Sequence, residues 1–198
     1  DEMGYMGNAA ILAGLDWHGV MSSIPFYGIG YSLLLVPLFA LGLPMTAIYW
    51  VALGMNVLFL LLSFVLAYLC LRRLFTALAP VSALLVAAAA TLYTNNMVQA
   101  QAAWCETLLY LLYWLLFWQV LRLLEKPGIL RMVLLAVTGG YLYMVHMRTL
   151  GVLIALAMTV LLFWAAGRLK WQDVLAFVLC FAAMLALQSA VKGWMNAE

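Results

Sequence analysis

The chain has 198 residues, of which 69% are hydrophobic and only 8% are charged, with a formal net charge of +2. So few charges cannot cover the surface of a soluble domain, and the small net charge gives no indication of nucleic-acid binding. The apolar runs are continuous and do not alternate, which excludes a transmembrane barrel. The composition therefore predicts an all-α, polytopic bundle of transmembrane helices.

Two adjacent carboxylates, Asp1 and Glu2, stand at the head of this apolar chain. If the first segment is helical, Glu2, Tyr5 and Met6 share one face, because residues three and four apart are neighbours on a helix. Asp1 would then lie at the helix start, where the macrodipole favours a carboxylate. Two interpretations stay open: the acidic pair belongs to a functional site, or it only caps the helix.

About six membrane spans are predicted, since a spanning helix needs about 20 apolar residues. They are 44–71, 77–93, 104–124, 128–145, 150–166 and 173–191. The run 28–41 is too short to cross comfortably and is predicted to be a helix at the membrane surface, with a short tilted span as the alternative. We expect residues 1–43 to form an outer-face loop with juxtamembrane helices, and residues 44–198 to form the transmembrane bundle.

The basic residues are divided unevenly between the two ends of the predicted spans. If 28–41 does not cross, only Arg148 and Lys192 fall on the side of the N-terminal segment, and the positive-inside rule makes that side the outer one. The loop 95–103 and the turn 146–148 are expected to share it. The cytoplasmic set comprises Arg72, Arg73, Arg122, Lys126, Arg131, Arg168 and Lys170.

Two further ionisable features are expected on the outer side. Glu106 opens an aromatic-rich apolar segment, and a carboxylate inside a membrane helix indicates function, with an ordinary boundary residue as the alternative. Arg148, beside His146, separates two apolar runs and needs an anionic partner, which could be a lipid phosphate, a substrate phosphate or Glu106. The alternative for Arg148 is a side chain that snorkels to the lipid headgroups.

Together these groups would suit chemistry on a lipid-linked phosphate. A carboxylate can take a proton from an attacking hydroxyl or amine, and a cation such as Arg148 stabilises a phosphate leaving group. Glu2, Asp16 and His18 are the candidates for binding a divalent metal. Two loop residues do not make a metal site, so hydration of the loop is the preferred interpretation of Asp16 and His18.

The order of these features resembles the GT-C superfamily of polyprenyl-phosphate-sugar-dependent glycosyltransferases, which includes protein O-mannosyltransferases and lipid A aminoarabinose transferases. Residues 1–5, D-E-M-G-Y, resemble the start of the family's first outer loop. Residues 27–38 resemble its surface helix and residues 56–73 its second transmembrane helix. Glu106 lies where relatives carry an acidic residue, and residues 148–151, R-T-L-G, resemble the family's R-x-x-G/A turn.

The resemblance implies a bacterial inner-membrane enzyme that moves a sugar from a polyprenyl-phosphate carrier to an acceptor on the outer face, with inversion. Its partners would be the lipid-linked sugar donor and membrane lipids. It implies that Asp1 is the general base, that Glu2 supports Asp1 or helps to bind a metal, and that Arg148 contacts the carrier phosphate. The candidate substrate-binding residues are Tyr5, Glu106, His146 and Arg148.

The sequence departs from the family pattern at two points. Residues 23–26 read S-I-P-F where many relatives carry Lys-Pro-Pro or His-Pro-Pro, and the family's first helix and C-terminal part are absent, so we expect a fragment whose own activity is open. The competing class is a transporter or a non-catalytic membrane subunit, in which Glu106 and Arg148 would form a coupling pair. Transporters show internal repeats or broken helices near the midplane, and no repeat is evident here.

Overall fold

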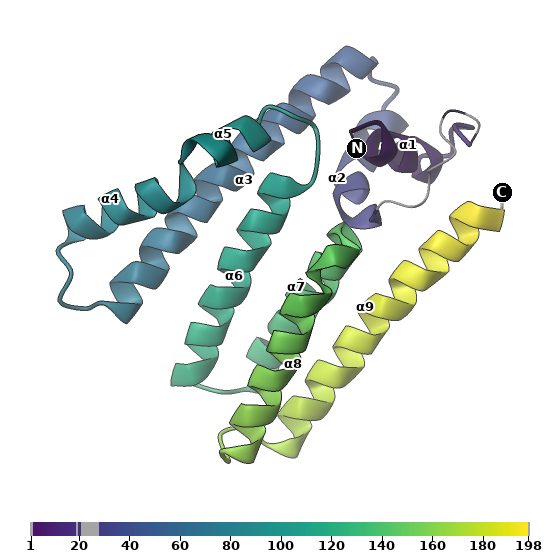
Figure 1. The fold of residues 1–198 in the computed structure, drawn as a ribbon. Helices are drawn as coiled ribbons and strands as arrows, with labels where there is room; N and C mark the ends of the chain where they lie inside the picture. Colours follow the sequence, from purple (N-terminus) through teal and green to yellow (C-terminus); the bar gives the residue numbers. More distant parts are fainter. Residues whose placement is uncertain (1, 19, 21–27, 198) are drawn as a thin grey trace.

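The computed structural model describes residues 2–18, 20 and 28–197. Over this part of the chain the backbone forms nine α-helices, one short 3-10 helix and no strand, which confirms the all-α prediction (Figure 1). The elements are α1 (Glu2–Leu12), α2 (Ile29–Ala40), α3 (Met45–Leu74), α4 (Pro80–Thr91), α5 (Thr94–Gln99), α6 (Glu106–Glu125), α7 (Ile129–Val145), η1 (Met147–Thr149), α8 (Leu150–Ala165) and α9 (Trp171–Ala197).

Within the described ranges, four helical stretches are long and apolar enough to cross a membrane: Met45–Leu74, Glu106–Glu125, Met147–Ala165 and Trp171–Met195. Their outward faces carry large apolar side chains, and Trp50 on α3 is 72% exposed. Exposure on this scale would cause a soluble protein to aggregate, whereas lipid covers it in a bilayer. The fold is therefore that of a multi-pass helical membrane protein.

Two of the six predicted spans form helices shorter than the usual length of a crossing. α4 has 12 residues, because Pro80 fits the first turn of a helix but cannot continue one from earlier residues, and because the chain breaks again at Leu92 before α5. α7 has 17 residues, and a rise of 1.5 Å per residue makes it about 26 Å long, against about 30 Å for the hydrocarbon core. By length, the structure supports four spans.

Successive apolar helices run in alternating directions, so that their ends form two opposite faces (Figure 1). On one face, Arg73 near the end of α3 pairs with Glu125 at the end of α6. Arg168, just after α8, donates a hydrogen bond to the backbone oxygen of Leu124 at 3.4 Å. The ends of α3, α6 and α8 therefore meet, and they carry basic residues that the sequence assigns to one side.

The N-terminal helices cover the opposite face. Every residue from Gly4 to Ile11 of α1 is buried, so this helix lies inside the fold. α2 packs closely on the end of α7, where a Cβ atom built on Gly30 would lie 2.7 Å from the backbone nitrogen of Val145. Tyr141 on α7 donates a hydrogen bond to the carbonyl oxygen of Gly30 at 2.8 Å. These contacts hold α2 against the end of α7.

Candidate functional site

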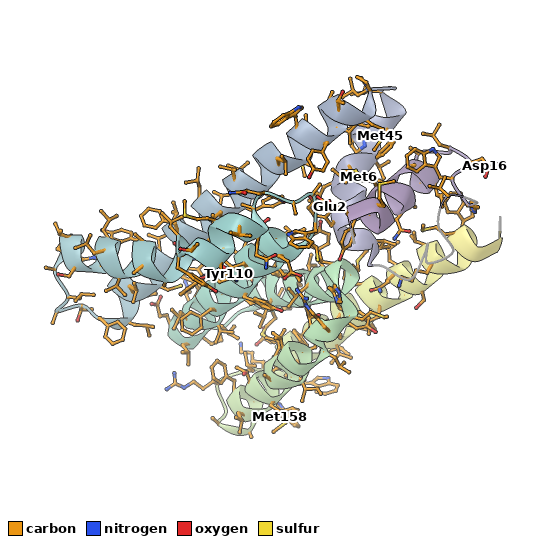
Figure 2. The ribbon with its side chains drawn as sticks, turned by 45° about the horizontal axis from the view of Figure 1, so that its top comes forward. Glu2, Met6, Asp16, Met45, Tyr110 and Met158 are labelled. Atoms are coloured by element: carbon orange, nitrogen blue, oxygen red, sulfur yellow. The ribbon has the colours of Figure 1, made fainter. Side chains whose placement is uncertain are left out.

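The candidate site lies where α1 crosses the segment between α5 and α6. Figure 2 shows Glu2 near the centre of the molecule, at the meeting point of α1 with the later helices, and Asp16 at its edge. The carboxylate oxygen Oε1 of Glu2 accepts two hydrogen bonds, from the Tyr49 hydroxyl at 2.9 Å and from the backbone N–H of Ala103 at 2.6 Å. Glu2 therefore holds α1, α3 and the segment before α6 together.

Asp1, the predicted general base, lies outside the described residues, and so does the departure from the family pattern at residues 23–26. The structure describes Glu2, the immediate neighbour of Asp1 in the sequence. The role of Asp1 therefore stays a prediction.

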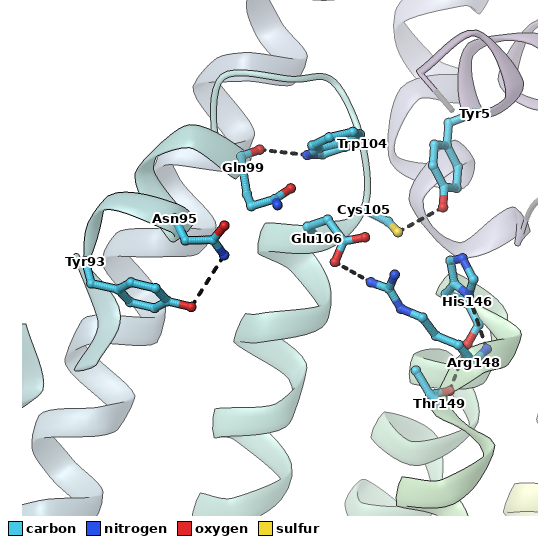
Figure 3. Close-up of polar contacts among 10 residues, drawn as sticks. All are labelled: Tyr5, Tyr93, Asn95, Gln99, Trp104, Cys105, Glu106, His146, Arg148 and Thr149. Carbon is cyan, nitrogen blue, oxygen red and sulfur yellow. Dashed lines mark hydrogen bonds and ion pairs between the residues drawn. The ribbon is translucent and has the colours of Figure 1, made fainter. Parts of the chain in front are cut away.

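Tyr5 lies on the same helix as Glu2 and contacts the start of α6. Its hydroxyl forms a hydrogen bond of 2.9 Å with the sulfur of Cys105, and either group can donate (Figure 3). Both side chains are buried, and burial raises the pKa of the Tyr5 phenol far above its usual range and that of the Cys105 thiol to about 11. Both groups therefore stay protonated at neutral pH. Tyr5 fixes the residue that precedes Glu106, and a contact between Tyr5 and substrate stays a prediction.

Glu106 and Arg148 meet across the site. Glu106 lies in the first turn of α6 and Arg148 in η1, and the guanidinium of Arg148 donates to the carboxylate of Glu106 (Figure 3). The helix start also favours a carboxylate, because the unpaired N–H groups there carry partial positive charge. Of the three anionic partners considered for Arg148, the structure contains the protein side chain.

His146 shapes the turn that carries Arg148. Its Nδ1 accepts the backbone N–H of Arg148 at 3.1 Å, and His146 is the residue before η1. Burial lowers the pKa of His146, and the Arg148 cation lowers it further. The neutral imidazole is therefore the form that accepts this bond, and His146 positions Arg148.

The segment between α5 and α6 has a further partner that sequence reasoning missed. Asn56 on α3 is fully buried, donates to the backbone oxygen of Ala102 at 2.5 Å, and accepts a hydrogen bond of 3.2 Å from the hydroxyl of Tyr31. A carboxamide within an otherwise apolar span is costly unless it is bonded, and this cost is the signal that would have identified Asn56.

A cavity of about 130 Å³ lies on the other side of the first turn of α6, between α3, α5 and α6. Glu106 lines it together with residues of α5, so this carboxylate borders both the cavity and Arg148. The other lining residues are Leu60, Asn95, Asn96, Gln99, Thr107, Leu109, Tyr110 and Tyr113.

The three candidate metal ligands do not come together. Asp16 and His18 line a separate cavity of about 230 Å³ near the end of α1, whereas Glu2 is bonded to Tyr49 and Ala103. Where the structure describes the chain, no group of three or more His, Cys, Asp or Glu side chains could hold a metal ion. The described side chains therefore do not form a donor set that fits a divalent metal.

Fold and site together define a class: an all-helical membrane protein with a polar site at one end of the bundle. No family model, curated protein or solved structure matches the chain. Function is therefore inferred from the chemistry of the site.

Proposed function

We propose that the protein is a membrane glycosyltransferase that moves a sugar from a polyprenyl-phosphate carrier to an acceptor, with inversion at the anomeric carbon. One observation carries the proposal: the Arg148–Glu106 pair stands beside a segment that Glu2 anchors, so carboxylates and a cation from three distant parts of the chain share one end of the bundle.

The proposed reaction is a single displacement. The acceptor oxygen or nitrogen attacks the anomeric carbon and forms the new glycosidic bond, while the bond from that carbon to the phosphate oxygen breaks and its electron pair leaves with the phosphate. Asp1 takes the proton of the acceptor as general base. Glu2 positions the start of α1 through its bonds to Tyr49 and Ala103.

Arg148 is proposed to stabilise the charge that develops on the leaving phosphate. Its side chain is 49% exposed and thus accessible to a ligand. A guanidinium has five N–H donors in a planar fork, so Arg148 can contact a phosphate while it stays bonded to Glu106. His146 supports this role by fixing the backbone of Arg148.

We also propose an orientation and a number of crossings. With α4–α5 and α7 as shorter crossings, six segments would traverse the bilayer, and the basic face around Arg73 and Arg168 would be cytoplasmic. The site at the other face would then open to the outer side of the inner membrane of a bacterium. A lipid-linked donor moves within the bilayer and can therefore reach a site at this position directly.

The decisive experiment replaces Asp1. In proteoliposomes that contain a polyprenyl-phosphate-linked hexose, Asp1→Asn is expected to lower the rate of sugar transfer by about 10²-fold or more, because a carboxamide cannot accept the proton. Asp173→Asn, at the opposite face, is the matched control and is expected to transfer at the wild-type rate. Normal transfer by Asp1→Asn would refute the general-base assignment.

A transporter is the second candidate, and the observed Glu106–Arg148 pair is the observation that favours it. An ion pair in a transporter exchanges partners during the cycle, so Glu106→Gln would abolish coupled uptake of a solute into proteoliposomes. Sugar transfer with no solute uptake would exclude this candidate.

A further inference from the structure

The side chains that line the cavity between α3, α5 and α6 differ in chemistry from Arg148, the proposed phosphate contact. Its polar lining consists of three carboxamides, one hydroxyl, two phenols and a single carboxylate, with no basic residue among the side chains that line it. At about 130 Å³, it far exceeds the ~10–15 Å³ that one water molecule needs. The cavity can therefore hold a small polar ligand.

Two buried polar atoms in this lining are left without partners. The hydroxyl oxygen of Thr107, a residue that is 2% exposed, has no hydrogen-bond partner in the described part of the chain, and neither has the amide oxygen Oε1 of Gln99. A buried polar group without a partner costs about 1–3 kcal/mol, so such a group indicates a ligand. Figure 3 shows the amide of Gln99 between α5 and the first turn of α6, and the amide of Asn95 on the same side.

The lining selects the charge of the ligand. A phosphate only accepts hydrogen bonds and is best bound by lysine or arginine, and neither residue lines the cavity. A sugar hydroxyl donates and accepts, and so matches carboxamides and a threonine hydroxyl, which do the same. Tyr110 and Tyr113 add flat apolar surface for the carbon face of a ring.

We propose that this cavity binds the hexose ring of the lipid-linked donor, while Arg148 binds its phosphate. The inference rests on the proposed function and deepens it. Glu106 connects the two subsites, because it lines the cavity and its Oε2 contacts Arg148. Thr107 and Gln99 bind the sugar hydroxyls, and their substitution acts on the sugar and not on the phosphate.

The test measures binding of two probes to the protein in nanodiscs: polyprenyl phosphate, and the same lipid phosphate that carries one hexose. The ratio of the two affinities measures the contribution of the sugar to binding, because the probes differ only in the hexose. Thr107→Val and Gln99→Leu are each expected to reduce this ratio about three- to tenfold, the loss of one hydrogen bond, with the affinity for the bare lipid unchanged. Arg148→Ala is expected to weaken both lipids equally.

Two variants control for folding. Thr107→Ser keeps the hydroxyl and is expected to keep the wild-type ratio. Thr159→Val makes the same change on α8, where the Thr159 hydroxyl donates to the backbone oxygen of Ala155. This variant is also expected to keep the wild-type ratio. A wild-type ratio in Thr107→Val and Gln99→Leu, or a cavity that holds only water in the donor complex, would overturn the proposal.

A third probe, methyl hexopyranoside, separates this inference from the proposed function. Binding of the free glycoside that is lost in Thr107→Val, without any sugar transfer or binding of lipid phosphate, would support the cavity and refute the transferase. Sugar transfer with an unchanged ratio in Thr107→Val would support the transferase and refute the cavity.

Discussion

The carboxylate of Glu2 and the backbone N–H of Ala103, 101 residues apart in the sequence, are joined by a hydrogen bond of 2.6 Å. Because the hydroxyl of Tyr49 donates to the same oxygen, one side chain connects α1, α3 and the segment that leads into α6. Glu106 follows that segment directly, so the position of the ion pair depends on the first turn of α1.

Removal of the Glu2 carboxylate is expected to destabilise the fold. Glu2→Ala leaves the buried N–H of Ala103 and the Tyr49 hydroxyl without an acceptor, and should lower the free energy of unfolding by about 2–3 kcal/mol. Glu2→Gln keeps an acceptor oxygen and should cost less than about 1 kcal/mol. Unfolding in mixed SDS micelles, followed by circular dichroism, measures both, and equal stability of Glu2→Ala and wild type would contradict the anchor role.

The Arg148–Glu106 pair is expected to matter more for ligand use than for stability. Its side chains are 49% and 31% exposed, so a double-mutant cycle should give a coupling of only about 0.2–1 kcal/mol. Arg148→Ala should raise KM for the lipid-linked donor more than KM for the acceptor. Arg168→Ala, at the other face, should change neither KM. An equal loss for donor and acceptor in Arg148→Ala would argue against a phosphate contact.

His146 should make the turn at Arg148 sensitive to acid. Burial and the Arg148 cation lower its pKa below the ordinary 6.5, so the unfolded chain binds the proton more readily than the fold. The stability that neutral His146 gives to the fold is therefore complete above about pH 6.5. It is lost as the pH falls through the lower pKa of His146 in the folded state. Protonation also removes the Nδ1 acceptor of the Arg148 N–H.

The chemical shift of the His146 ring measures this titration. The chain has two histidines, and the variant His18→Gln assigns the remaining signal to His146. A midpoint at or above 6.5 in the folded protein would contradict the predicted direction.

The contact of α2 with α7 should tolerate no side chain at Gly30. A Cβ atom there would lie 2.7 Å from the backbone nitrogen of Val145, so Gly30→Ala must separate the two helices and should cost about 1–3 kcal/mol. Gly151→Ala is the matched control, since no described atom lies within 4 Å of its Cβ position and alanine favours a helix. Thermal unfolding of both variants in detergent compares them, and a Gly30→Ala protein as stable as Gly151→Ala would refute the close contact.

The proposed orientation can be tested on intact cells. Asn95→Cys and Lys126→Cys place thiols at exposed positions near opposite faces of the bundle. With a membrane-impermeant maleimide, the thiol at position 95 should react from outside and the thiol at position 126 only after lysis. The reverse pattern would invert the orientation.

Local sequence patterns predicted the helices and their approximate bounds. The predicted span 104–124 corresponds to Glu106–Glu125, and 150–166 to Leu150–Ala165, because continuous apolar runs have few alternatives in a membrane. The span 77–93 was too long, since hydropathy does not register how Pro80 fixes the start of a helix. Four of the six predicted spans are confirmed by length, and the other two correspond to the shorter helices α4 and α7.

The contacts of the site were less accessible to sequence reasoning. Glu106 was one of three partners considered for Arg148, and only the packing of α6 against α7 determines which of them lies within reach. Cys105 is buried, with 1% exposure, and its bond to Tyr5 depends on the path of α1. A contact between residues about a hundred positions apart leaves no periodic pattern in the local sequence.

The short segment between α5 and α6 is bonded at Ala102, Ala103 and Cys105, each time by a side chain from another part of the chain. Substitutions at Asn56, Glu2 and Tyr5 therefore act on the same short segment, and their effects should not add. In a mutational scan, these three positions are expected to show epistasis with one another. In a set of homologues, they would change together or not at all.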